Sequence, residues 1–145
     1  MAKNAYQILG EIGRIDARID VKLAEVQRLW DRATKVNQVL TTVKVASSAG
    51  GGSMSEAVDR IVDLEQEINA EVDRLVDYKR KVQKVLDKME NPDYVKVVYK
   101  RYFERKPWEV IAGEMNMCTR NVLRYNKLAM PIFLRLWEEA DSDAV

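Results

Sequence analysis

The sequence predicts an all-α protein in which a long antiparallel helical hairpin, or coiled coil, precedes a trihelical helix-turn-helix domain. Apolar residues recur at alternating spacings of three and four along two long segments, which is the pattern of a left-handed coiled coil. The 145 residues include only six glycines and three prolines, so few positions interrupt a helix. We expect a coiled-coil hairpin over residues 1–90, a helix-turn-helix over 91–137 and an acidic tail over 138–145.

The first long helix is expected over residues 4–40. Lys22 interrupts its apolar stripe, and Leu23 lies beside the interruption. At 1.5 Å per residue such a helix is about 55 Å long, too long to pack within a compact domain of this size, so it needs a partner helix. The stripe consists of Ile8, Ile12, Ile15, Ile19, Val26, Leu29, Ala33, Val36 and Leu40.

A second stripe supplies the partner helix, and Glu65 and Lys79 interrupt it. A Gly/Ser-rich loop over residues 47–53 separates the two stripes, because a Gly50-Gly51-Gly52 run is unfavourable inside a helix. Ser53-Met54-Ser55-Glu56 matches a capping box and places the helix start at Ser53. The second stripe consists of Val58, Ile61, Ile68, Val72, Leu75, Val82, Leu86 and Met89. We expect the flanking residues Leu23, Leu64 and Tyr78 to stay open and to bind a second copy.

The last third of the chain predicts three helices. Asn91 is the expected N-cap of a helix over 93–104, with Pro92 at its first position. A second helix begins at Pro107-Trp108. Its inward-facing residues are expected to be Trp108, Ile111, Ala112 and Met115. Asn116-Met117-Cys118 forms a tight turn in which Asn116 adopts the left-handed conformation. The final helix starts at Thr119, presents Val122, Tyr125, Leu128 and Ala129 to the core, and is kinked or restarted at about residue 130 by Pro131.

The net charge of +1 is unevenly distributed along the chain. Residues 91–137 carry a net charge of +5 and the tail carries −4, and no acidic residue occurs over 117–134. Thr119, Arg120, Asn121, Arg124 and Lys127 share one face of the final helix, whereas a merely solvated face usually mixes Glu with Lys. Arg and Asn bind base edges, and Lys and Thr suit phosphates, so this face is the candidate DNA-binding surface.

The stretch over residues 99–122 resembles the region 4 helix-turn-helix of sigma-70-type factors. The matching residues are Arg101-Tyr102, Trp108-Glu109-Val110-Ile111-Ala112, Val122, Arg124 and Ala129-Met130. Over residues 6–137 the chain is similar to small phage and prophage transcriptional regulators of Gram-positive bacteria, and the stretch over 61–77 is characteristic of that group. Their members combine a helical hairpin, a glycine-rich loop and a sigma-like domain.

The resemblance implies which residues read bases, namely Thr119, Arg120, Leu123 and Arg124. Two positions depart from the family pattern. Cys118 stands where the family usually has a serine N-cap, which leaves Thr119 as the alternative cap. Leu123 stands where a polar side chain is common, so it either contacts a thymine methyl group or packs within the protein. The resemblance also implies activation of phage late genes, although the chain lacks the sigma regions that melt a promoter.

Composition excludes several classes of function. The chain has no histidine, the commonest general base and metal ligand, so we expect neither an enzyme nor a metal or cofactor site. A single cysteine, the absence of an apolar membrane span and a charged N-terminal region indicate a cytoplasmic protein, here in the host bacterial cell.

The function expected from these observations is DNA binding by a phage- or prophage-encoded transcriptional regulator. Its partners would be double-stranded DNA and a second copy in a homo-oligomer, with a dimer favoured, and RNA polymerase is a further candidate. Two alternatives remain open. One is a DNA-packaging protein like the small terminase subunit, although that family places its DNA-binding unit before the oligomerisation helices. The other is a polymerase-binding adaptor that does not bind DNA.

Overall fold

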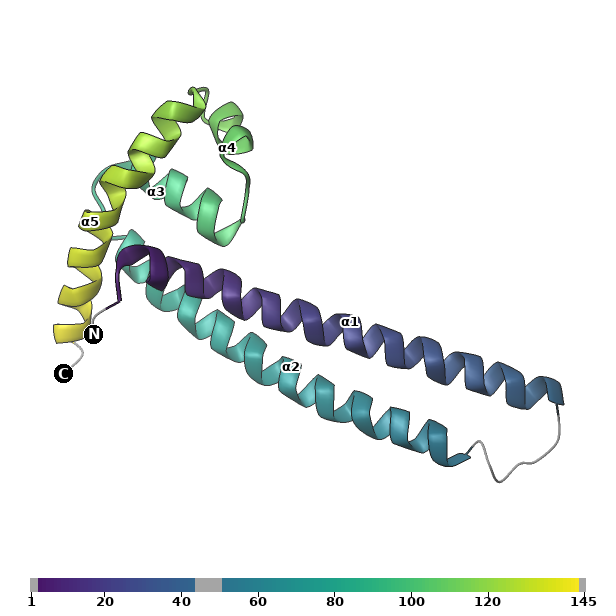
Figure 1. Ribbon diagram of the computed structural model, residues 1–145. Helices are drawn as coiled ribbons and strands as arrows, with labels where there is room; N and C mark the ends of the chain where they lie inside the picture. The colour runs from purple at the N-terminus through teal and green to yellow at the C-terminus, as the bar shows by residue number, and fades with distance from the viewer. Residues whose placement is uncertain (1–2, 44–50, 144–145) are drawn as a thin grey trace. The chain divides into compact units, whose positions relative to one another are not determined.

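The computed structural model describes residues 3–43 and 51–143, with side chains over 3–35 and 54–142 (Figure 1). These residues form five α-helices: α1 (Ala5–Val43), α2 (Gly51–Leu86), α3 (Pro92–Val98), α4 (Trp108–Glu114) and α5 (Thr119–Asp143). A short π-helix, η1 (Tyr99–Phe103), directly follows α3. The described ranges contain no strand, which confirms the all-α class and the long N-terminal pair of helices.

The chain divides into two compact units. Unit 1 consists of Met1–Ile15 and Leu75–Val145, and unit 2 is Asp16–Arg74. The start of α1, the end of α2 and the three short C-terminal elements with α5 therefore belong to unit 1. Unit 2 contains the remaining parts of α1 and α2. Each unit has its own set of internal contacts.

The N-terminus of α1 is closed by a reciprocal cap. The backbone N–H of Gln7 donates to Asn4 Oδ1 at 2.8 Å, and the backbone N–H of Asn4 donates to Gln7 Oε1 at 3.0 Å. This is the arrangement of a capping box, here built from Asn and Gln, and it satisfies two N–H groups at the helix start. The helix consequently begins at Ala5, one residue after the predicted start.

The N-terminus of α2 differs from the prediction. The helix begins at Gly51, so residues 51–53 belong to it rather than to the predicted loop over 47–53 and the predicted start at Ser53. Glycine is unfavourable mainly in the interior of a helix, because it loses more conformational freedom than other residues, and Gly51 and Gly52 lie in the first turn of α2. Residues 47–50 of the predicted loop lie outside the described part of the chain.

In unit 2, α1 and α2 lie side by side (Figure 1) and bury an apolar seam. On α2 this seam follows Ile61, Leu64 and Ile68, which are at most 9% exposed. Two members of the predicted stripe, Val58 and Val72, are instead exposed. The prediction was wrong here because the regular spacing of the seam continues from Ile68 to a charged residue, Glu71, rather than to the apolar Val72.

Glu71 is accommodated in the seam by cations. Its side chain is 12% exposed and lies 3.5 Å from Arg18 Nε and 3.7 Å from both Lys22 Nζ and Arg74 Nη1. Lys22 is the residue that interrupts the apolar stripe of α1, so a charged position of α1 lies opposite a charged position of α2 in the seam. A carboxylate in a partly buried position is tolerated only when opposite charges compensate its lost hydration, and these three side chains supply that compensation.

In unit 1, Tyr78 joins α2 to two other helices. Its hydroxyl donates a 2.7 Å hydrogen bond to the carbonyl oxygen of Ile8 on α1, and its ring centroid lies 6.1 Å from that of Trp137 on α5. Tyr78 was expected to be open to a second copy, as was Leu64, but Tyr78 is partly buried and Leu64 is 3% exposed. Of the three residues predicted to stay open, Leu23 alone is exposed.

Helix α5 continues without a break through Pro131 to Asp143. Of the two alternatives predicted for Pro131, a kink or a restart near residue 130, the restart is therefore wrong, and residues 138–143 of the predicted acidic tail are helical. Proline removes one backbone hydrogen bond, but Met130 and Phe133 on either side of Pro131 are buried, and their burial favours continuation of the helix. Beyond it, Lys81 Nζ lies 3.2 Å from Asp141 Oδ1 and 4.5 Å from the Trp137 ring centroid.

Replacing Tyr78 by phenylalanine is expected to lower the stability of unit 1 by about 1 kcal/mol at neutral pH, the typical net contribution of one hydrogen bond. Burial, with a smaller effect of the Glu11 carboxylate, raises the pKa of Tyr78 from 10.0 to about 12. The Tyr78 hydroxyl therefore loses its proton at a lower pH in the unfolded chain than in the folded protein. The free energy of unfolding should consequently fall as the pH rises from about 10 to 12. Urea titrations across that pH range should show a smaller loss for Tyr78→Phe than for the unmodified protein.

Candidate nucleic-acid interface

The C-terminal helices of unit 1 pack around a small apolar core. Val97 of α3, Ile111 and Ala112 of α4 and Val122 of α5 are buried together. The partly buried side chains packed against them are those of Trp108, Met115, Met117 and Tyr125. The inward positions predicted for the second and third helices are thus confirmed, apart from Leu128, which is 43% exposed. This core fixes α4 and the start of α5 relative to each other.

Helix α3 begins with the predicted cap and ends earlier than predicted. Asn91 Oδ1 accepts from the backbone N–H groups of Asp93 at 3.0 Å and Tyr94 at 3.4 Å, and Pro92 occupies the first helical position. The expected single helix over 93–104 instead changes to the π-helix η1 at Tyr99, whose carbonyl accepts from the Glu104 N–H at 3.1 Å. Hydrogen bonds that span five residues cannot be read from a 3.6-residue apolar period, because both helix types bury nearly the same positions.

The connection between α4 and α5 depends on Asn116. Its φ of 56° is left-handed, as predicted, and the Met117 N–H then donates to the Ala112 carbonyl at 2.9 Å while the Asn116 N–H donates to Gly113 at 3.4 Å. This pair of bonds is a Schellman motif, which closes the C-terminus of α4. Met117 follows directly and packs on the small core, so the turn is short and its geometry is defined.

Helix α5 starts at Thr119, with Cys118 in the capping position. The Cys118 carbonyl accepts from the N–H groups of Asn121 at 3.1 Å and Val122 at 3.2 Å. The helix start therefore coincides with the predicted residue and does not shift to make Thr119 the cap. As a result, the side chains of the first two turns of α5 follow immediately after the α4–α5 turn.

The candidate DNA-binding residues lie within the first three turns of α5. Arg120, Arg124 and Lys127 are exposed, Leu123 is 44% exposed, and Thr119 and Asn121 are partly exposed. Arg124 Nε and Nη2 both donate to Asn121 Oδ1, at 3.2 and 2.8 Å, and its guanidinium lies 5.4 Å from the Tyr125 ring centroid. Asn121 and Tyr125 thus hold Arg124 on the outer face of α5, one turn from Arg120.

A charge cluster that joins α4 to the preceding segment was not predicted. Glu114 at the end of α4 binds Lys100 Nζ at 2.6 Å and Lys106 Nζ at 2.8 Å. Hydrogen bonds from the two ammonium groups lower the pKa of the Glu114 carboxyl, and the carboxylate raises the pKa of Lys106. These residues come from three separate elements, so no sequence period indicated that they meet. Two of the lysines that make this segment basic are therefore paired, whereas Arg120 and Lys127 face solvent.

Asn126 is a second feature of this unit that the sequence did not predict. It is 6% exposed, and its Oδ1 accepts a 3.3 Å hydrogen bond from the Tyr102 hydroxyl, whose pKa is raised by burial. Its position was detectable, because Asn126 lies four residues after the buried Val122 and three before the buried Ala129. A buried amide bonded to η1 gives α5 a polar link to the preceding element and does not belong to the candidate DNA-binding surface.

No group of three or more potential metal ligands occurs in the described ranges, and no helix there is long and apolar enough to cross a membrane. Comparison of the chain with models of protein families, with curated proteins and with solved structures gives no match. The interpretation of the α5 surface therefore depends on its own residues and geometry.

Proposed function

We propose that this protein is a DNA-binding transcriptional regulator that inserts the first two turns of α5 into the major groove. The observation that carries the proposal is the exposed face formed by Arg120, Arg124 and Lys127, with no acidic residue over 117–134. A single α-helix fits the major groove, and Arg and Asn side chains pair with guanine and adenine edges there. The defined turn before α5 would orient this face.

Further parts of the proposal follow from the resemblance stated above. The chain would combine an antiparallel coiled-coil hairpin over 1–90 with a sigma region 4-like helix-turn-helix over 91–137. It would be encoded by a phage or prophage, act in the bacterial cytoplasm as an activator of late genes, and self-associate, with a dimer favoured. RNA polymerase is a candidate second partner.

DNA binding is preferred over the two alternatives for separate reasons. A polymerase-binding adaptor that does not bind DNA needs no basic face, whereas the outer face of α5 carries two arginines and a lysine around Leu123. A terminase-like packaging protein also binds DNA but assembles as a ring, so light scattering distinguishes it from a dimer. Absence of DNA binding at low salt would favour the adaptor.

Salt dependence tests whether this face meets phosphates. The logarithm of the DNA affinity should fall linearly with the logarithm of salt concentration, with a slope of about −0.9 per phosphate neutralised. Lys127→Ala should make the slope smaller in magnitude by about one while the sequence preference stays the same. Lys35→Ala in unit 2, also an exposed lysine, is the matched control and should leave the slope unchanged. A slope near zero in the unmodified protein would contradict the proposal.

A further inference from the structure

The two flanks of the helix pair in unit 2 differ in chemistry. Arg18 of α1 lies beside Glu71 of α2, and farther along α1 Arg32 lines one surface cavity together with Arg60 of α2. Later residues of α1 thus meet earlier residues of α2, so the helices run in opposite directions. The residues at heptad spacing along this side are charged on both helices: Arg18, Glu25, Arg32, Arg60, Glu67 and Arg74. We refer to this side as the charged flank.

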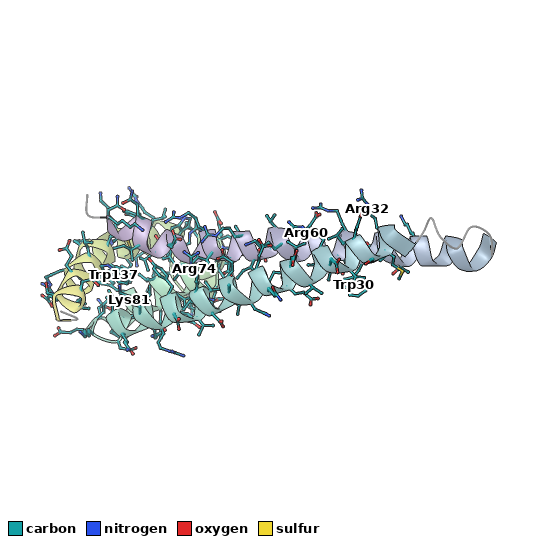
Figure 2. The ribbon with its side chains drawn as sticks, turned by 90° about the horizontal axis from the view of Figure 1, so that it is seen from below. Trp30, Arg32, Arg60, Arg74, Lys81 and Trp137 are labelled. Atoms are coloured by element: carbon teal, nitrogen blue, oxygen red, sulfur yellow. The ribbon has the colours of Figure 1, made fainter. Side chains whose placement is uncertain are left out.

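The opposite side carries exposed apolar residues, which we define as the apolar flank: Leu23, Trp30, Val58, Val62 and Val72. Each directly follows a position of the seam, and in antiparallel helices such residues lie on the same side of the pair. Their exposed fractions range from 38% for Val58 to 50% for Leu23. Figure 2 shows Arg32 and Arg60 rising from one edge of the helix pair and Trp30 on the other edge.

Two helices that pack only on each other need a narrow apolar seam. Helices that also contact further helices carry a wider apolar stripe. In each heptad this stripe includes one position that flanks the seam in addition to the two seam positions. Trp30 at 47% exposure and Val58 occupy such flanking positions on the two helices. The pattern of unit 2 is therefore that of helices with a second neighbour, and no other described segment belongs to this unit.

We propose that the apolar flank binds the apolar flank of a second copy of this chain, so that the two helix pairs form a four-helix bundle. The proposal locates the self-association included in the proposed function and rests on that part of it. A two-fold arrangement places the same surface on both sides of the interface, so each Trp30 packs against apolar residues of the partner.

Charge favours a second copy over other occupants. The other residues that directly follow seam positions between these apolar residues are the uncharged Gln27, Thr34 and Asn69 and one exposed carboxylate, Glu65. The flank therefore offers no cation to bind DNA phosphates or an anionic membrane, whereas its apolar residues can pack against the same residues of a second copy. The five apolar residues expose on the order of 300–400 Å² per copy. That is comparable with the apolar part of an interface of about 800 Å² per partner.

Sedimentation equilibrium of the full chain tests the proposal. The unmodified protein should be a dimer, and Trp30→Glu should raise the dimer dissociation constant at least 100-fold with unchanged helix content by circular dichroism. Val21→Glu is the matched control, because Val21 is 67% exposed on the same helix but precedes a seam position and lies toward the charged flank. This control should change the dissociation constant less than threefold.

Several other results would overturn the proposed dimer or separate it from DNA binding. If Trp30→Glu loses helix content, Val62→Gln on α2 replaces it, and a folded Val62→Gln protein that stays dimeric at all concentrations overturns the proposal. A monomeric unmodified protein, or equal dissociation by Trp30→Glu and Val21→Glu, also overturns it. DNA affinity measured on the same samples separates the two claims, since a Trp30→Glu monomer that still binds one half-site keeps the DNA proposal intact.

Discussion

Replacing Arg120 or Arg124 by alanine should weaken specific DNA binding by about 1–3 kcal/mol, which is roughly 5- to 150-fold, and should relax the base preference. Both side chains are exposed one turn apart at the start of α5, so they reach the same groove. Arg124 should show the larger effect, because its hydrogen bonds to Asn121 at 2.8 and 3.2 Å orient it before DNA binds. Fluorescence anisotropy with DNA selected from a random library measures both quantities.

Arg135→Ala is the matched control for these two substitutions. Arg135 is an exposed arginine of the same helix, farther from the α4–α5 turn, and lies 3.9 Å from Glu139. It should leave DNA affinity nearly unchanged, and all three variants should keep their melting temperature because exposed substitutions typically change stability by at most about 0.5 kcal/mol. Unchanged affinity in both Arg120→Ala and Arg124→Ala would place the recognition surface elsewhere.

Phe133→Ala is expected to destabilise unit 1 by about 3–5 kcal/mol. Phe133 is fully buried beyond Pro131, and its ring stacks on Trp137 with centroids 5.9 Å apart. Truncation leaves a cavity at the place where α5 meets Tyr78 of α2, through Trp137. Urea unfolding followed by circular dichroism measures the loss.

The control for Phe133→Ala is Leu128→Ala on the same helix. Leu128→Ala also shortens an apolar side chain, but Leu128 is 43% exposed, so the substitution should cost less than about 1 kcal/mol. Equal effects of the two substitutions would mean that the second half of α5 does not pack into unit 1, contrary to the burial of Phe133.

Local sequence rules predicted the features that depend on neighbouring residues. Asn91 as a cap, Asn116 in the left-handed conformation and the start of α5 at Thr119 were all correct, because each is determined by one or two adjacent backbone groups. The DNA-binding role of the α5 face stays a prediction. That role requires the basic side chains of this face to be exposed. They are exposed, as expected for a segment that has no acidic residues to pair with them.

The sequence rules failed where a distant segment decides the outcome. Counting apolar residues favoured Val72 for the seam of α2, although Glu71 lies there because Arg18 and Lys22 approach it from α1. The local effect of Pro131 was likewise outweighed by the burial of Phe133. The cluster of Glu114 with Lys100 and Lys106 depends on the path of the chain through η1, which carries no periodic signal.

The position of Glu71 also limits how far α1 can slide along α2. A slip by one heptad in either direction would put Glu11 or Glu25 where Arg18 now lies, and Ile15 or Leu29 where Lys22 lies. Two carboxylates would then meet in a poorly hydrated position with the lysine removed, although the apolar contacts of the seam would be nearly as good as before. Electrostatic repulsion in the shifted alignments therefore selects a single alignment of the two helices, which hydrophobic burial alone would leave degenerate.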